Sequence, residues 1–357
     1  MWQKTSPEKA GFAADLADRL DGLVREGRAP NLHGVVVARR GELVLEHYGS
    51  GPDFSWGVPH GTVDFGPDTL HDLRSVTKSV TGLLYGIALA GGLVPGPGEP
   101  ILRHFPEYPD LAADPRRARL TVEHALTMTL GLEWDESAPY TGPENSEIAM
   151  EMAEDRYRFV LERPIVEEPG VRWHYNGGAT ALIGALIARG AGRPLEEFAR
   201  AALFEPLGID SFEWMAGDDG VASPAAGLRL TPRDMARIGR AVLEREVIPA
   251  DWADAMLRPR VPVRGRPPTA TCGTSTPTGG PPRRATADSG SSSCPASTSS
   301  WPSPRATTTG PTRTPRPGRS WRRSSCPRSR PDRRSRGDPQ RAASSAACDG
   351  RRVRRSR

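Results

Sequence analysis

The chain has 357 residues, enough for one large domain or two ordinary ones, and its composition changes abruptly near residue 265. Residues 266–357 contain no Leu, Ile, Phe, Tyr or Met, so they cannot bury enough apolar surface to offset the loss of chain entropy. They carry 20 Arg and 4 Asp, a net charge of +16, which leaves about −11 for residues 1–265 out of the total of +5. The sequence predicts an acidic folded domain over 1–264 and a disordered, Arg/Ser/Pro/Thr-rich tail over 265–357.

Several classes of protein are excluded by what the sequence lacks. All four cysteines lie in the predicted tail without zinc-site spacing, and no P-loop, Rossmann fingerprint, HExxH or GxSxG motif occurs. We therefore expect no metal and no cofactor. The N-terminus has no signal-peptide pattern, and the most apolar stretch, Val80 to Val94, is too short to cross a bilayer. A cytoplasmic protein without a membrane partner is expected.

The folded part has a mixed α/β pattern. A helix is predicted over residues 8–26, then two strands between Gly34 and Gly49 around an Arg-Gly-Glu turn, then a short strand that leads into a helix ending near Gly91. From residue 95 the pattern is mostly helical. It comprises a helix capped by Thr121, a helix over 146–163, a turn at Pro169–Gly170, a helix over 179–188, the segment PLEEFARAAL, and a helix opened by Thr231–Pro232 that runs to Leu243.

Ser75 and Lys78 are the first candidates for catalysis. They are three residues apart where a strand-like segment meets the chain's most apolar helix, so the Lys78 amine can reach the Ser75 hydroxyl. The positive end of the helix would stabilise an oxyanion there, and partial burial would lower the pKa of Lys78 so that it acts as a base. Since the spacing alone is weak, a solvated lysine at a helix start is the alternative.

The segment HDLRSVTKSVTGLLYGIAL resembles the nucleophile helix of the serine β-lactamase and penicillin-binding superfamily, in its class C-like, esterase and 6-aminohexanoate-oligomer-hydrolase branch. Further segments follow in the family's order over roughly residues 5–260, among them LTVEHALTMTLGLEWDE, EEPGVRWHYNGGATALIGALI and GLRLTPRDMARIGRAVL. The resemblance implies an α/β (α+β) fold. In that fold a central antiparallel sheet is flanked by helices, with a mostly helical subdomain beside it.

The same resemblance assigns roles to residues around a second motif. Tyr175, in RWHYNGG, falls where the family has a tyrosine facing the serine–lysine pair, and could take the Ser75 proton and return it to the leaving group. The usual pattern is Tyr-x-Asn, whereas here Asn176 follows Tyr175 directly and Gly177 occupies the place of the asparagine. We expect Asn176, Gly177 and Trp173 to contact substrate, with core packing as the alternative for Trp173.

The resemblance implies a serine hydrolase that cleaves a small ester or amide, including lactams or short peptides, through an acyl-enzyme on Ser75. The alternative is a catalytically inactive or unstable truncated remnant that keeps a basic tail and has no enzymatic role. A tail that binds nucleic acid is the weaker hypothesis, because the segment has arginine without lysine and few aromatic residues. The sequence does not indicate an oligomeric state or the exact substrate.

The family closes its site with a C-terminal strand that carries a third motif, and the resemblance stops where that strand should begin. We predict that the missing sheet strands were lost through a frameshift. In a shifted frame, residues 295–308 can encode Gly-Leu-Asp-Leu-Val-Val-Ala-Val-Thr-Ala-Gly-Asp-Tyr, which resembles a terminal strand of the family, and residues 287–292 can encode Gly-Phe-Gly-Gln-Gln. Resequencing of the gene across codons 262–270 tests this, and an uninterrupted frame that encodes the same tail contradicts it.

Overall fold

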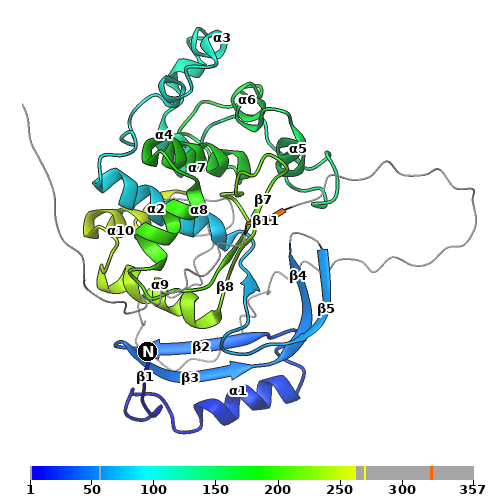
Figure 1. Cartoon of the computed structure of the whole chain (residues 1–357), viewed down its shortest axis with the longest axis vertical. Helices are drawn as coiled ribbons and strands as arrows, with labels where there is room; N and C mark the ends of the chain where they lie inside the picture. The colour runs from blue at the N-terminus through cyan, green and yellow to red at the C-terminus, as the bar shows by residue number, and fades with distance from the viewer. Residues whose placement is uncertain (1, 56–57, 263–268, 271–321, 325–357) are drawn as a thin grey trace, which may run out of the picture. The chain divides into compact units, whose positions relative to one another are not determined.

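The computed structural model describes residues 2–55, 58–262, 269–270 and 322–324, all of which belong to one unit, Met1–Ser325 (Figure 1). Apart from the two short strands at 269–270 and 322–324, the predicted tail lies outside the described residues, as does a second unit, Cys326–Arg357. Among the described residues, no helix combines the length and apolarity needed to cross a membrane.

The predicted N-terminal hairpin is confirmed. Strands β2 (Gly34–Arg39) and β3 (Glu42–Tyr48) pair antiparallel, and β1 (Gln3–Lys4) adds to β3 in parallel. The turn residues Arg40 and Gly41 have φ of 53° and 78°, as a two-residue turn between twisted strands requires. Helix α1 (Leu16–Arg25) begins later than predicted, because the preceding segment forms turns in which Gly11 has φ of 80°, a value no α-helix contains.

A second antiparallel sheet lies beside helix α2 (Val76–Ala90). It has the order β11-β7-β8-β6, and its strands are β11 (Arg322–Ser324), β7 (Glu213–Ala216), β8 (Leu228–Leu230) and β6 (His71–Asp72). Two further pairs are β4 (Ser50–Ser55) with β5 (Val58–Asp64), and β9 (Pro259–Val261) with β10 (Thr269–Ala270). The sequence predicts no strand after residue 264, but β10 and β11 form because strand pairing uses backbone groups that every non-proline residue carries.

In the part of the chain that the structure describes, the antiparallel strands form several sheets, and together with the helices they confirm the predicted α/β (α+β) fold class. Among the described residues, β2 pairs only with β3, which leaves its other edge without a strand partner.

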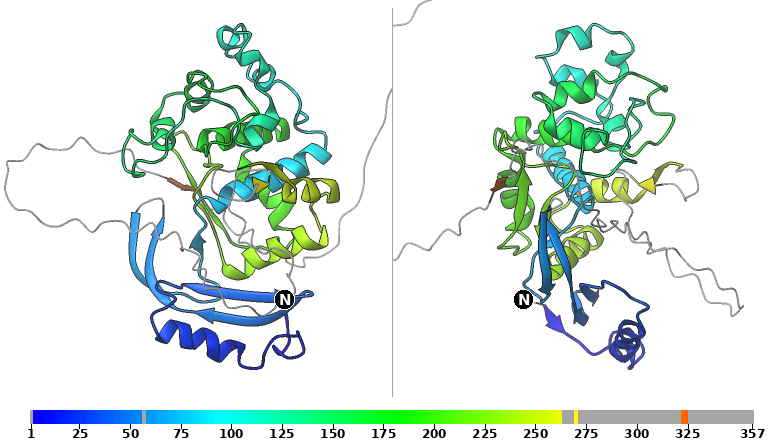
Figure 2. Two further views of the ribbon diagram at one scale, coloured as in Figure 1. Left: turned by 180° about the vertical axis from the view of Figure 1, so that it is seen from behind. Right: turned by 90° about the vertical axis from the view of Figure 1, so that its right-hand side faces the viewer.

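The helices form the core of the described unit (Figures 1 and 2). They are α2 (Val76–Ala90), α3 (Pro109–Ala112), α4 (Val122–Leu126), α5 (Ser146–Met152), α6 (Arg156–Leu161), α7 (Gly177–Ala191), α8 (Leu195–Ala199), α9 (Pro232–Glu244) and α10 (Ala250–Leu257), with shorter 3₁₀ or π turns at Ile101–His104, Arg117–Arg119 and Arg200–Phe204. Helices α2 and α7 lie side by side and are apolar on most of their surface, as expected of helices buried in a core.

Two predicted helix starts are confirmed and one predicted helix is divided. Thr121 and Thr231 cap α4 and α9 through their side-chain oxygens. The helix predicted over 146–163 is interrupted, because Asp155 accepts hydrogen bonds from the N–H groups of Tyr157 and Arg158 and so caps a new helix, α6. An aspartate cap competes with helix continuation at this position.

Trp252 of helix α10 packs against helix α2 and is hydrogen-bonded to it. Its indole N–H donates to the Gly82 carbonyl at 2.9 Å, and its ring lies 5.1 Å from that of Tyr85. Position 86 requires glycine, because a Cβ added there would lie 1.9 Å from the Trp252 ring. The contact therefore depends on both a large residue in α10 and a missing side chain in α2.

We expect Trp252→Ala to lower the free energy of unfolding by about 3–5 kcal/mol, because it leaves a large cavity against α2 and removes the hydrogen bond to the Gly82 carbonyl. Chemical denaturation followed by circular dichroism measures the change. Leu257→Ala on the same helix is the control, since Leu257 is 46% exposed and its removal should cost less than about 0.5 kcal/mol. Equal effects of the two substitutions would contradict the packing described.

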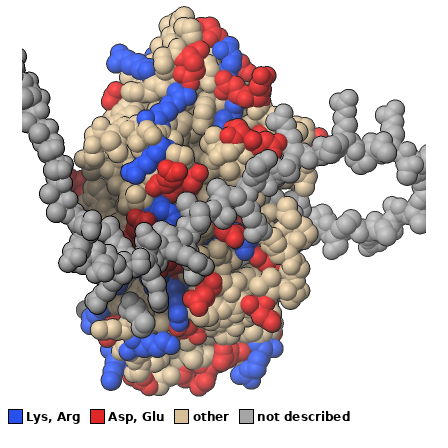
Figure 3. Space-filling model, in the orientation of Figure 1, with Lys and Arg blue, Asp and Glu red and all other residues tan. Residues whose placement is uncertain are grey.

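Charges of both signs are interspersed on the face shown in Figure 3. Many of them are paired, for example Arg158 with Asp110 at 2.6 Å and Arg163 with Glu133 at 3.0 Å. Such exposed pairs contribute little stability, so most of the fold's stability comes from the buried helices.

Candidate active site

Ser75 stands at the turn between strand β6 and helix α2. It occupies the N-cap position of α2, yet its side chain makes no capping hydrogen bond and remains free for other contacts. The preceding residue, Arg74, has φ of 46°, an uncommon value for a residue with a side chain, and its N–H donates to Asp72 Oδ1 at 2.9 Å. This sharp turn places the half-buried Ser75 hydroxyl at the positive end of α2.

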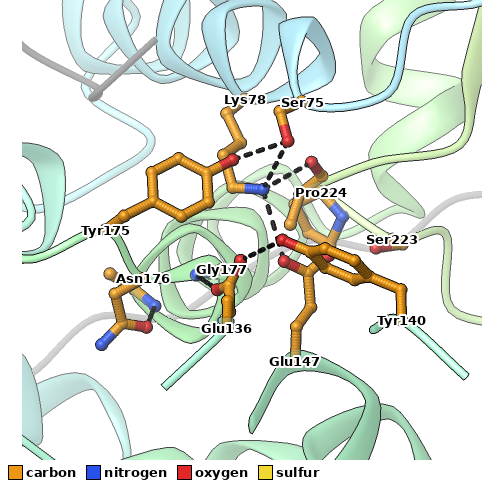
Figure 4. A network of polar contacts seen from close by, with 12 residues as sticks. Ser75, Lys78, Glu136, Tyr140, Glu147, Tyr175, Asn176, Gly177, Ser223 and Pro224 are labelled. Carbon is orange, nitrogen blue, oxygen red and sulfur yellow. Dashed lines mark hydrogen bonds and ion pairs between the residues drawn. The ribbon is translucent and has the colours of Figure 1, made fainter. Parts of the chain in front are cut away.

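The three residues predicted to be catalytic come together around the Ser75 hydroxyl (Figure 4). The Tyr175 hydroxyl donates to Ser75 Oγ at 2.6 Å, although the two residues are 100 positions apart. Lys78 Nζ donates to the same oxygen at 3.4 Å, and lies 4.9 Å from the centroid of the Tyr175 ring. Two groups that carry protons therefore converge on one oxygen atom.

Lys78 is completely buried and is surrounded by acceptors. Besides Ser75 Oγ, its Nζ contacts the Ala225 carbonyl at 2.9 Å and Glu147 Oε2 at 3.5 Å. The expectation that burial lowers the pKa of Lys78 is wrong. Burial does act in that direction, but the Glu147 carboxylate, Tyr175 and Glu136 outweigh it and raise the pKa above its ordinary value.

Glu147, Glu136 and Tyr140 belong to the same cluster, and sequence reasoning missed all three. The Tyr140 hydroxyl donates to Glu136 Oε2 at 2.7 Å, while Glu136 Oε1 accepts from the indole N–H of Trp134 and the backbone N–H of Gly177, both at 2.6 Å. Figure 4 shows Glu147 and the Tyr140 ring next to each other below Lys78. No motif marked these residues, and a glutamate early in a helix, as Glu147 is in α5, is ordinarily interpreted as a partner of the helix dipole.

The residues predicted to contact substrate lie next to Tyr175, and their role in binding stays a prediction. Asn176 is buried and its Oδ1 accepts from the Ala179 N–H at 2.8 Å, so it caps helix α7. Gly177 donates its N–H to Glu136. Trp173 is half-buried with its ring 6.1 Å from the Tyr175 ring, and its buried indole nitrogen has no hydrogen-bond partner among the described atoms.

No group of three or more His, Cys, Asp or Glu side chains in the described part of the chain is arranged as metal ligands would be. The polar atoms of the site are instead bound to one another. Lys78 Nζ links Ser75 Oγ to the Glu147 carboxylate in one network, in which Lys78 and Glu147 are buried and Ser75 is half-buried.

The fold agrees with that of known proteins. The chain belongs to the Beta-lactamase family, whose model matches residues 16–288 and so extends past residue 264, where the sequence predicts the folded domain to end. It is 30% identical to esterase EstB of Burkholderia gladioli over 210 residues, which are 55% of this chain and 51% of that protein. It is 24% identical to the 6-aminohexanoate-dimer hydrolase of Paenarthrobacter ureafaciens over 260 residues, 68% of this chain and 61% of that protein.

Solved structures show the same fold at low sequence identity. EstCE1, a hydrolase with promiscuous acyltransferase activity, has a TM-score of 0.55 at 18% identity, covering 70% of this chain and 78% of that chain. The octameric penicillin-binding protein homologue from Pyrococcus abyssi has a TM-score of 0.51 at 18% identity, covering 71% of this chain and 62% of that chain. The chain spans about half to three fifths of the length of the two curated relatives.

Proposed function

We propose that the protein is a serine hydrolase that cleaves ester or amide bonds through an acyl-enzyme on Ser75. The observation that carries this proposal is the convergence of Tyr175 and Lys78 on the Ser75 hydroxyl, at 2.6 and 3.4 Å. Membership of the Beta-lactamase family supports it, as do relatives named as an esterase and an amide-dimer hydrolase.

In the proposed reaction, Tyr175 first gives up its hydroxyl proton to solvent and acts as a phenolate beside the Lys78 ammonium; Ser75 Oγ then attacks the carbonyl carbon of the substrate while the Ser75 proton passes to the phenolate oxygen. The two oxygens are close enough for direct transfer. Tyr175 then protonates the leaving alcohol or amine, and the acyl group stays on Ser75 as an ester. Water attacks this ester, gives its proton to Tyr175, and the proton returns to Ser75 when the acid is released.

Lys78 acts in this scheme through its charge. An ammonium beside the Tyr175 ring and Ser75 Oγ favours the negative charge that develops on either oxygen during proton transfer. The backbone N–H of Ser75, at the positive end of α2, would supply one donor to the tetrahedral oxyanion. The family's second donor comes from the C-terminal strand, and the loss of one such donor costs roughly a hundred- to thousandfold in rate.

The substrate class proposed is a small ester or amide, including lactams and short peptides. A panel of p-nitrophenyl esters, a chromogenic cephalosporin and short amides separates these candidates. The cytoplasmic location expected from the sequence stays a prediction.

A fluorophosphonate probe tests the proposal, because it reacts covalently with an activated serine whatever the natural substrate is. We expect one labelled site per chain, located at Ser75 by mass spectrometry of the labelled peptide. A folded protein that takes up no label would contradict the proposal and favour the inactive remnant.

A further inference from the structure

The Lys78 amine is surrounded by oxygen atoms that can accept its protons. Ser75 Oγ, the Ala225 carbonyl and Glu147 Oε2 all lie within 3.5 Å of its Nζ, and the side chain is 0% exposed. An ammonium has three N–H donors and no acceptor, whereas a neutral amine has two donors and a lone pair that needs a donor of its own. The surroundings of Nζ therefore match the charged form.

A buried ammonium needs a counter-charge, and Glu147 supplies it. The Glu147 side chain is only 3% exposed, and its carboxylate comes from helix α5, 69 residues further along the chain than Lys78. Burial and the neighbouring Glu136 raise the pKa of Glu147, and the Lys78 charge opposes that shift without cancelling it. An isolated charge at either position would be strongly unfavourable, so the two side chains are needed together.

Gly177 makes the room that this carboxylate occupies. A Cβ at position 177 would lie 2.2 Å from Glu147 Oε2, 2.7 Å from Glu147 Cδ and 3.1 Å from Glu136 Oε1. Because the Glu147 carboxylate is buried against Lys78, it cannot swing aside without losing that contact. The glycine is required by the carboxylate and not by backbone conformation, since Gly177 is absent from the positive-φ residues.

We propose that Glu147 is a positioning residue that keeps Lys78 as an ammonium beside Ser75, and that its carboxylate fills the space of a side chain at position 177. The third position of the tyrosine motif is Gly177 in this chain. The Glu147 carboxylate, which comes from helix α5, occupies the space that a side chain at that position would fill. The proposal deepens the proposed function and rests on it for the catalytic consequence: with Lys78 charged, Tyr175 is the group that accepts the Ser75 proton.

The charge of Lys78 can be measured without any activity, because the chain has three lysines, at positions 4, 9 and 78. In a Lys4→Arg/Lys9→Arg background with isotope-labelled lysine, one NMR signal reports the Lys78 amine alone. We expect it to remain that of an ammonium up to a pH of about 10, and its titration midpoint to fall by at least about one pH unit in Glu147→Gln. Glu144→Gln, at an exposed position nearby, is the control and should leave the midpoint unchanged.

The space at position 177 is tested by a double-mutant cycle on thermal stability. We expect Gly177→Ala to lower Tm by at least about 4 °C in the parent chain but by no more than about 1 °C in the Glu147→Ala background, where the two closest colliding atoms are gone and only Glu136 Oε1 at 3.1 Å is left. Gly239→Ala in helix α9 is the control, since nothing lies within 4 Å of an added Cβ there. Equal costs of Gly177→Ala in both backgrounds would overturn this part of the proposal.

A pH profile connects the charge to catalysis. The activity that depends on the ammonium is lost as the pH rises through the Lys78 pKa, so Glu147→Gln should move the basic limb of kcat/KM to lower pH together with the NMR midpoint. An unchanged Lys78 midpoint in Glu147→Gln overturns the inference even if the protein hydrolyses esters. If the Lys78 midpoint shifts but no fluorophosphonate labelling occurs, the proposed function is contradicted and the counter-ion role of Glu147 is supported.

Discussion

Ser75→Ala is expected to lower kcat/KM for any ester or amide substrate by on the order of 10⁴–10⁶-fold, and to abolish labelling by a fluorophosphonate. The substitution removes the oxygen on which the Tyr175 and Lys78 contacts converge, and no other group can form the acyl ester. The measurement is steady-state hydrolysis of the substrate identified by the panel, with the unfolding curve recorded in parallel.

Ser79→Ala provides the matched control, because Ser79 lies on the same helix one turn after Ser75. It should keep labelling and hydrolysis within a fewfold of the parent. If Ser75→Ala retained most of the hydrolysis, a serine elsewhere or a contaminating enzyme would be responsible, and the proposed function would fail.

Tyr175→Phe is expected to lower kcat/KM by about 10²–10⁴-fold, the range for loss of a general acid–base group. The phenyl ring is kept, so the packing of Trp173 and the position of Lys78 over the ring should change little. The loss should be greatest for substrates with a poor leaving group, since these depend most on protonation as the bond breaks.

A comparison of p-nitrophenyl esters with alkyl esters measures that dependence on the leaving group. Tyr157→Phe removes a phenol hydroxyl outside the cluster and should leave both rates unchanged. An equal loss on activated and unactivated esters after Tyr175→Phe would indicate that Tyr175 positions Ser75 without transferring its proton.

Local signals explain which parts of the fold the sequence could predict. The Arg40–Gly41 turn needs positive φ at both residues, and Thr231 followed by Pro232 combines an N-cap with a preset helical φ, so each element is defined within a few residues. The break at Asp155 carried a local signal as well, an aspartate able to cap a helix, but the apolar periodicity of 146–163 favoured one continuous helix. The separation of the strands into several sheets depends on contacts between distant segments and has no local signature.

The same distinction between local signals and contacts across the chain applies to the candidate site. Ser75 and Lys78 are three residues apart, so helical geometry brings them together, and Tyr175 was predicted through the family resemblance. Glu147 was not predicted, because its partner is 69 residues away and its charge looks ordinary at a helix start. The direction of the Lys78 pKa was wrong for the same reason: burial could be expected from the apolar helix, but the buried carboxylate opposite could not.

The burial of Lys78 also determines how the protein responds to amine-reactive reagents. Lys4 is 74% exposed at its side chain and Lys9 is exposed too, while Lys78 has no exposed surface. All other basic side chains apart from histidine are arginine, which such reagents leave untouched. Coupling to a dye or a sensor surface through amines is therefore directed to the first nine residues of the chain. A protein immobilised in this way keeps Ser75, Lys78 and Tyr175 chemically intact, so that substrates can be screened on it directly.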